Sequence, residues 1–238
     1  MRIITKSEIG AKYINGFGER PLPVKRVFAH YSLTKGYGPK ASKKEDVASV
    51  LTVINVGQSR FRRGPSYNYA ITEAGRVFEL LKPERIGAHT KGFNTTGLGI
   101  VFVGDFTKRL PSQKALDAFE WLLASLVNNG SITKTFSLQG HRDVVATSCP
   151  GKYIYDRLPA MKAVALKVVE LPKIKRGSSG DSVLLVKKIL KGLGYGGMNL
   201  KSKKFGSGTE KAVRAWQADT PLVATTGVIS NDDWARLL

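Results

Sequence analysis

A continuous run of apolar residues near the middle of the chain constrains its fold more than any other sequence feature. Residues 98–103 read LGIVFV, with no polar side chain among them. Such a run is typical of a central strand in a sheet that is covered on both faces. Residues 24–30 and 67–78 have strand-like patterns, whereas residues 44–58 and 112–128 place apolar side chains at the spacing of one helical face. Strands that alternate with helices predict an α/β domain, in which helices cover a mixed sheet.

The last third of the chain has a different pattern. Residues 171–177, LPKIKRG, combine proline, charge and glycine, as a linker does. Beyond it, three serines are each followed three residues later by an acidic residue, which is the capping-box pattern of a helix start. These pairs are Ser178 with Asp181, Ser207 with Glu210, and Ser230 with Asp233. We therefore predict an α/β domain over residues 1–170 and a small all-α domain of three helices over residues 171–238.

The chain is strongly basic. Its 238 residues include 38 Lys and Arg against 18 Asp and Glu, which gives a formal net charge of +20. A field of this sign attracts polyanions such as nucleic acid, anionic lipid or the anionic polymers of a bacterial envelope. The charge is spread along the chain, and no helix-turn-helix, zinc-finger or RNA-binding pattern accompanies it. We therefore expect no specific nucleic-acid target.

No segment of the sequence predicts insertion into a membrane. The apolar runs are shorter than the roughly 20 residues that a spanning helix needs. No apolar stretch of signal-peptide length follows Met1 and Arg2. We therefore expect the protein to be made and kept in the cytoplasm. The single cysteine, Cys149, excludes an intramolecular disulfide.

Four residues could supply soft metal ligands: Cys149 and the three histidines, His30, His89 and His141. Neutral imidazole and thiolate are ligands that zinc prefers, and three such ligands plus a water molecule make a catalytic zinc site. His30 ends the first predicted strand, while seven residues separate His141 from Cys149. A lone histidine is more often an ordinary polar residue, and a lone cysteine is more often a small buried hydrophobic residue. The case for a zinc site therefore depends on the sequence around these residues.

That sequence resembles the zinc-dependent N-acetylmuramoyl-L-alanine amidases of phage lysozymes, which share their fold with peptidoglycan recognition proteins. The resemblance spans roughly residues 1–160. Its matching segments, in order, are IITKSEIGAK at 3–12, VFAH at 27–30, YNY at 67–69 through Gly75, HTKGFN at 89–94 with LGI at 98–100, and HRD at 141–143 with TSCPG at 147–151.

The resemblance implies a role for each matching residue. Three residues correspond to the family's zinc ligands: His30, His141 and Cys149. Tyr67 corresponds to the family's catalytic tyrosine. Thr147 stands where phage members have lysine and recognition-type members have threonine, which implies a second catalytic position. His89 and Asn94 correspond to residues that line the substrate groove and bind substrate.

Residues 172–238 resemble a second family, the three-helix peptidoglycan-binding domains that accompany many wall hydrolases. The match includes RGSSGDSV at 176–183, LGY at 193–195 and AWQ at 215–217. The family usually has phenylalanine at the position of Trp216. We expect Trp216 and Trp234 to lie in the core of this domain and not on a sugar-binding surface.

Together the two resemblances imply a monomeric peptidoglycan hydrolase, a phage endolysin, that holds Zn²⁺ and uses a zinc-activated water to cleave the amide bond between N-acetylmuramic acid and L-alanine. Its expected partners are bacterial peptidoglycan and, through charge, anionic envelope polymers. The expected location is the host cytoplasm until lysis and the cell wall afterwards. Two alternatives remain open: a catalytically inactive peptidoglycan receptor, which needs no thiolate, and a basic nucleic-acid-binding protein, which accounts for the charge alone.

Overall fold

The computed structural model describes residues 1–13, 16–220 and 224–237. Two compact units result: the larger unit, Arg2–Val164, and the smaller unit, Ala165–Leu238. The helix α4 (Leu158–Glu170) crosses this division, and the predicted domain boundary falls at its end. That boundary stays a prediction, and the final residue of the predicted second domain, Leu238, lies outside the described residues.

The larger unit is built on a six-stranded sheet. Its strands lie in the order β1 (Ile3–Ile4), β4 (Val77–Glu79), β3 (Tyr69–Ile71), β5 (Gly97–Phe102), β2 (Val24–Tyr31) and β6 (Ile132–Gly140). Neighbouring strands are parallel except for β3 and β4, which are antiparallel. A short 3-10 helix, η1 (Ser7–Ile9), follows β1. The sheet is therefore mixed, which confirms the predicted fold class.

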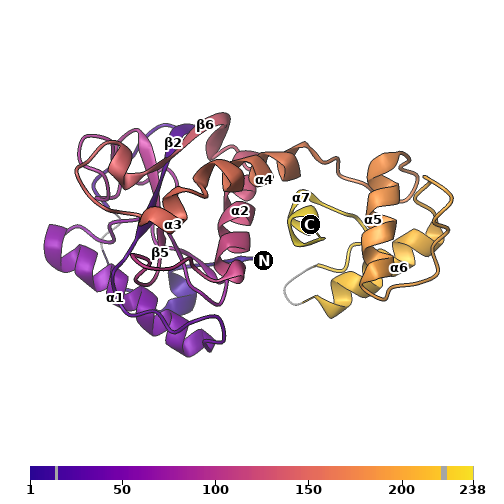
Figure 1. Ribbon diagram of the computed structural model, residues 1–238, viewed down its shortest axis with the longest axis horizontal. Helices are drawn as coiled ribbons and strands as arrows, with labels where there is room; N and C mark the ends of the chain where they lie inside the picture. The colour runs from indigo at the N-terminus through magenta and orange to yellow at the C-terminus, as the bar shows by residue number, and fades with distance from the viewer. Residues whose placement is uncertain (14–15, 221–223, 238) are drawn as a thin grey trace. The chain divides into compact units, whose positions relative to one another are not determined.

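Helices cover both faces of this sheet (Figure 1). They are α1 (Lys43–Phe61) and α2 (Gln113–Asn128). Successive residues of β5 face opposite ways, because strand side chains alternate. Val101 belongs to the apolar cluster that α1 shares, whereas the ring of Phe102 lies 5.1 Å from that of Phe119 on α2. Every residue of β5 is buried, which confirms the prediction of a central strand.

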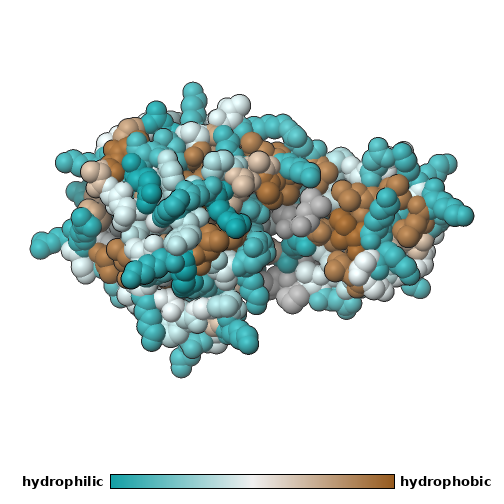
Figure 2. All heavy atoms as spheres, in the orientation of Figure 1, coloured by the Kyte–Doolittle hydropathy of each residue, from teal (hydrophilic) through white to brown (hydrophobic). Residues whose placement is uncertain are grey.

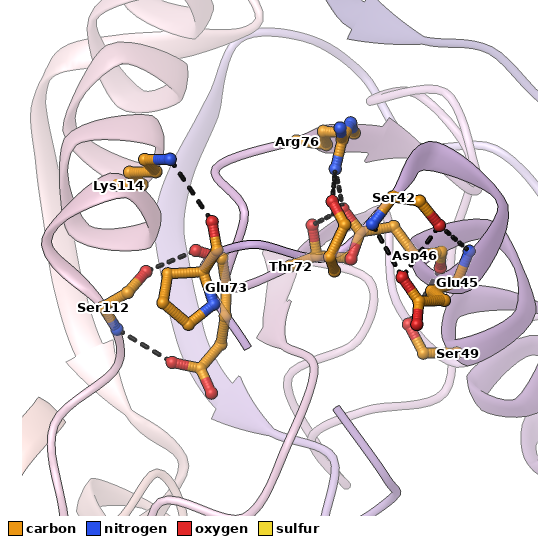
Figure 3. A network of polar contacts seen from close by, with 11 residues as sticks. Ser42, Glu45, Asp46, Ser49, Thr72, Glu73, Arg76, Ser112 and Lys114 are labelled. Atoms are coloured by element: carbon orange, nitrogen blue, oxygen red, sulfur yellow. Dashed lines mark hydrogen bonds and ion pairs between the residues drawn. The ribbon is translucent and has the colours of Figure 1, made fainter. Parts of the chain in front are cut away.

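A polar network ties both helices to the turn between β3 and β4 (Figure 3). Asp46 of α1 is 1% exposed, and its carboxylate accepts hydrogen bonds from Thr72 Oγ1 at 2.7 Å and Arg76 Nη1 at 2.6 Å. On the other side of the turn, the Glu73 carboxylate accepts the backbone N–H of Ser112, the N-cap of α2, at 3.0 Å. Loss of Arg76 would leave the buried Asp46 carboxylate without its charged partner, which is destabilising. The network therefore fixes where both helices start against the sheet.

Three elements lie between α2 and α4 in the larger unit: the strand β6, the 3-10 helix η2 (His141–Asp143) and the helix α3 (Lys152–Tyr155). β6 lies at the edge of the sheet beside β2. Most of its residues are partly or fully exposed. An edge strand of this kind needs no continuous apolar run, so the sequence pattern did not predict it.

The smaller unit contains the three predicted helices: α5 (Asp181–Gly192), α6 (Ser207–Asp219) and α7 (Asn231–Leu237). Trp234 is fully buried and Trp216 is 5% exposed, so both are core residues, as expected.

The segment predicted to be a linker is packed onto the smaller unit. The indole N–H of Trp234 donates to the carbonyl oxygen of Pro172 at 2.8 Å. Ile174 is buried and exchanges two backbone hydrogen bonds with Ile229, at 3.1 and 2.8 Å. The core of the smaller unit therefore includes residues that the sequence pattern assigned to a linker.

The predicted capping boxes are correct at one helix and wrong at two. At α7, Ser230 Oγ accepts the Asp233 backbone N–H at 3.3 Å, and the Asp233 carboxylate accepts the Ser230 backbone N–H at 2.7 Å. The N-caps of α5 and α6 are Gly180 and Gly206, which make no side-chain cap. Ser178 instead accepts a backbone N–H in the preceding turn, and Ser207 already lies inside α6. Gly180 has a φ of 123°, a conformation that serine rarely adopts.

A buried lysine organises the basic loop between α5 and α6. Lys187 is 1% exposed, and its ammonium group donates to the backbone carbonyl oxygens of Asn199, Ser202 and Lys204, at 3.1, 2.8 and 2.7 Å. A fully buried charge needs such partners.

Among the described residues, no helix has both the length and the apolar character required to cross a membrane. On the face drawn in Figure 2, each unit carries many hydrophilic side chains, and smaller apolar patches lie among these side chains.

Candidate metal centre

The two predicted histidine ligands lie at the ends of neighbouring parallel strands. β2 and β6 pair with Ala29 opposite Gly140, so the next residues, His30 and His141, reach the same edge of the sheet. Their ring centroids are 4.7 Å apart. His30 is 1% exposed, whereas His141 is half-buried. The centre is therefore anchored on the sheet on one side and open toward solvent at His141.

The loop after η2 brings Cys149 to the two histidines. The backbone N–H of Arg142 donates to the carbonyl oxygen of Cys149 at 3.0 Å. Cys149 Sγ lies 3.6 Å from His30 Nδ1. The candidate ligand atoms of His30, His141 and Cys149 all lie within 4.8 Å of one another. The structure thus brings together the three residues that the sequence singled out as metal ligands.

This arrangement fits zinc. Zinc binds histidine nitrogen at about 2.0–2.1 Å and cysteine sulfur at about 2.3 Å, so two such ligands of a tetrahedral ion lie roughly 3.6 Å apart. The distance between His30 Nδ1 and Cys149 Sγ matches that separation. Three protein ligands of this type leave the fourth position of a catalytic zinc site for water or substrate.

Burial disfavours the charged forms of all three candidate ligands. Burial lowers the pKa of His30 well below its ordinary value, with added contributions from His89 and His141, and burial also lowers the pKa of His141. Burial raises the pKa of the Cys149 thiol to about 12. A metal ion that binds here must displace the thiol proton, so its affinity increases with pH.

The second ring nitrogen of His30 has partners behind the centre. His30 Nε2 lies 3.3 Å from His89 Nδ1 and 3.4 Å from Thr90 Oγ1. With His30 holding a metal through Nδ1, its ring proton would lie on Nε2, within hydrogen-bond distance of both groups. A ligating histidine usually donates its other N–H in this way, and the contact fixes the orientation of the ring. The fully buried Thr90 was missed by the sequence analysis, although it lies next to a predicted site residue.

The two predicted groove residues, His89 and Asn94, are linked through the backbone. Asn94 Oδ1 accepts the backbone N–H groups of His89 and Thr90, at 2.9 and 2.7 Å. His89 is 7% exposed, and burial, together with the nearby Arg20 guanidinium, lowers its pKa to about 3. The structure therefore places a neutral His89 against His30. Contacts of His89 and Asn94 with substrate stay predictions.

The two predicted catalytic residues also lie near the centre. The Tyr67 ring, just before β3, is 5.0 Å from the His30 ring and 6.3 Å from the His89 ring, between centroids. Burial raises the pKa of Tyr67, so its hydroxyl remains a proton donor. Thr147 is exposed, and its hydroxyl accepts the backbone N–H of Cys149 at 3.2 Å. Catalytic roles for both residues stay predictions.

Two family models match the chain, and together they cover both units. The model described as N-acetylmuramoyl-L-alanine amidase matches residues 20–152, which include all the predicted site residues. The chain belongs to the N-acetylmuramoyl-L-alanine amidase family. In this amidase-family chain, residues 179–237 match a second model, described as a putative peptidoglycan binding domain. Both resemblances found in the sequence are confirmed.

Relatives of this amidase-family chain include recognition proteins and an amidase. Peptidoglycan-recognition protein 1 of Holotrichia diomphalia is 32% identical over 155 residues, covering 64% of this chain and 77% of the relative. Peptidoglycan-recognition protein SD of Drosophila melanogaster is 35% identical over 157 residues, covering 64% and 82%. The N-acetylmuramoyl-L-alanine amidase of Mus musculus is 33% identical over 93 residues, covering 39% of this chain and 18% of the mouse protein.

Solved structures of recognition proteins have the same fold as the larger unit. Drosophila PGRP-LB matches with a TM-score of 0.63 and 27% identity, covering 67% of this chain and 93% of the other. Peptidoglycan recognition protein LE, in complex with tracheal cytotoxin, matches with a TM-score of 0.62 and 29% identity, covering 66% and 92%. Because the relatives include both kinds of protein, membership of the amidase family does not by itself distinguish hydrolysis from recognition.

Proposed function

We propose that this chain is a zinc-dependent amidase that hydrolyses the bond between N-acetylmuramic acid and L-alanine in bacterial peptidoglycan. The observation that carries the proposal is the cluster of His30, His141 and Cys149, whose ligand atoms lie within 4.8 Å of one another. A receptor that only binds wall fragments has no use for a buried thiol beside two histidines. The complete ligand set therefore favours hydrolysis over recognition.

Each residue of the centre has a separate role in the proposed reaction. Zinc held by His30, His141 and Cys149 would supply a Lewis acid, which polarises a carbonyl and lowers the pKa of water from about 15.7 to about 7. We infer that Tyr67, whose ring lies 5.0 Å from the His30 ring, donates a hydrogen bond from its phenolic O–H to the oxyanion that develops on the scissile carbonyl. Thr90, through its contact with His30 Nε2, keeps that imidazole in one orientation during the reaction.

We propose peptidoglycan as the partner of both units. The larger unit is similar to PGRP-LE, whose solved complex contains tracheal cytotoxin, described as monomeric diaminopimelic acid-type peptidoglycan. The smaller unit matches a putative peptidoglycan binding domain. The net charge of +20 adds attraction to anionic wall polymers, which salt screens beyond about 10 Å at 0.1 M. A monomeric state and storage in the host cytoplasm until lysis stay predictions of the sequence.

A soluble muropeptide that contains the N-acetylmuramic acid–L-alanine bond tests the proposal. The zinc-loaded protein is expected to split it into a sugar with a free lactyl carboxylate and a peptide with a free amino terminus, both identified by mass spectrometry. A chelator should stop the reaction, and added zinc should restore it. A zinc-loaded protein that binds the muropeptide and leaves it intact would support the receptor alternative and overturn the proposal.

A further inference from the structure

Three side chains hold the loop that carries Cys149, and we call them the loop clamp: Arg142, Asp143 and Tyr155. The Arg142 guanidinium donates through Nη2 to the backbone carbonyl oxygen of Ser148. Its Cζ atom lies 5.0 Å from the centre of the Tyr155 ring. The Tyr155 hydroxyl donates to the Asp143 carboxylate at 2.6 Å. The three side chains thus form one continuous set of contacts.

The loop clamp reaches both ends of the segment that bears two of the candidate ligands. At one end, the second oxygen of the Asp143 carboxylate accepts the backbone N–H of Gly140 at 2.9 Å, directly before His141. At the other end, the backbone N–H of Arg142 donates to the carbonyl oxygen of Cys149 at 3.0 Å. The distance between the two ligands therefore depends on contacts made by the residues next to His141.

The Tyr155 ring is packed closely against the end of β6. A Cβ atom at Gly140 would lie 2.7 Å from Tyr155 Cδ2 and 2.9 Å from Pro150 Cδ. Both distances are shorter than van der Waals contact, so only glycine lets the ring and the proline approach the strand this closely. The ring therefore contacts β6 at its last residue, Gly140, directly before His141, while it lies against the Arg142 guanidinium.

We propose that Arg142 is a positioning residue, which sets the location of Cys149 relative to His141 and so tunes metal affinity. Arginine suits this role because its planar guanidinium can stack on an aromatic ring while its N–H groups, held in a fixed plane, donate to a carbonyl oxygen, whereas the lysine ammonium is a compact charge without that planar geometry. The inference rests on the proposed function only in taking His30, His141 and Cys149 as metal ligands. It makes no use of the bond that is cleaved.

The zinc affinity of the full-length protein, measured by competition with a chromophoric chelator, tests this role. Arg142→Lys keeps the positive charge but loses the planar guanidinium and its stacking on Tyr155. We expect its zinc Kd to rise by about 10–100-fold, the range typical when a residue that supports a metal ligand is replaced. Tyr155→Phe keeps the ring under Arg142 and loses only the bond to Asp143, so we expect a smaller rise. Tyr153→Phe is the matched control, because Tyr153 lies on the same helix and is 44% exposed, and its Kd should match that of the wild type.

The absorption spectrum of the cobalt-substituted protein separates positioning from general stability. We expect Arg142→Lys to alter the thiolate-to-cobalt band, while thermal unfolding of the metal-free variant stays cooperative. Wild-type zinc affinity and a wild-type cobalt spectrum in both Arg142→Lys and Tyr155→Phe would overturn the proposal. Variants that unfold at a lower temperature but keep the wild-type zinc affinity would overturn the proposal too, because the loop clamp would then only stabilise the fold. A wild type that binds zinc and cleaves no muropeptide contradicts the proposed function without affecting this comparison.

Discussion

Cys149 Sγ lies 3.6 Å from His30 Nδ1, although 119 positions separate the two residues in the chain. β2 delivers His30 to the edge of the sheet, and the loop after η2 delivers Cys149 to the same place. The pair therefore exists only in the folded larger unit. A metal that binds this site but not the unfolded chain stabilises the fold, by about 4 kcal/mol at a free concentration 1,000 times its Kd.

Replacing Cys149 with serine should release the metal. We expect the wild type to retain about one zinc per chain after dialysis and Cys149→Ser to retain little, because a hydroxyl is a far poorer zinc ligand than a thiolate. Elemental analysis of both proteins measures this directly. Ala146→Ser adds a serine at an exposed position of the same loop and should keep its zinc. Equal zinc content in Cys149→Ser and the wild type would remove Cys149 from the ligand set.

Removing the Tyr67 hydroxyl should slow the reaction without affecting the metal. The Tyr67 ring lies 5.0 Å from the His30 ring, and loss of one donor to an oxyanion typically lowers kcat by about 100-fold or more. Steady-state kinetics of Tyr67→Phe on a soluble muropeptide should show this loss with unchanged zinc content. If kcat stays at the wild-type value, Tyr67 has no part in the chemistry.

Thr90→Val removes a hydroxyl behind His30 and keeps the shape of the side chain. Thr90 is fully buried, and its Oγ1 lies 3.4 Å from His30 Nε2. We expect the zinc Kd to rise by about tenfold, because an outer partner of a ligating histidine is lost. Thr52→Val is the control, since Thr52 is exposed on α1. A Kd equal to that of the wild type would show that His89 alone orients His30.

Stability should depend on pH through Glu120. Burial on α2, with a smaller contribution from Asp117, raises the pKa of Glu120 from 4.5 to about 7. The folded chain therefore binds a proton that the unfolded chain releases, and this stabilisation is complete below about pH 4.5 and lost as the pH rises through 7.

Glu120→Gln mimics the protonated side chain. Urea denaturation should find this variant more stable than the wild type at pH 8, by on the order of 1 kcal/mol, since solvent screening reduces the effect for a partly exposed group. At pH 4 the two proteins should be equally stable. If the difference in unfolding free energy between Glu120→Gln and the wild type is the same at pH 4 and at pH 8, the pKa of Glu120 is not raised.

The elements that the sequence predicted are those with strong local patterns. Burial on both faces gives β5 its apolar run, and burial on one face gives α1 and α2 their helical spacing of apolar residues. Both patterns can be recognised in the sequence alone. The edge strand β6 carries no such pattern because much of it is exposed. Two capping boxes failed because glycines at 180 and 206 supplied the helix starts instead.

The candidate ligands could be predicted, but their surroundings could not. His30, His141 and Cys149 stand in motifs that resemble those of a known family, and the structure brings them together. The contact of Thr90 with His30 depends on the packing of a loop against β2, which no spacing rule describes. Arg142 was visible beside His141 in the sequence, yet only the fold shows that it holds the loop of Cys149.

The end groups that the protein creates in intact peptidoglycan test the central claim most directly. Insoluble walls are incubated with the zinc-loaded full-length protein, after which new amino termini are labelled and identified and new reducing sugars are measured. The account predicts that amino-terminal L-alanine accumulates with time and that no reducing ends appear. New reducing ends, amino termini other than L-alanine, or no new end group of any kind would contradict it.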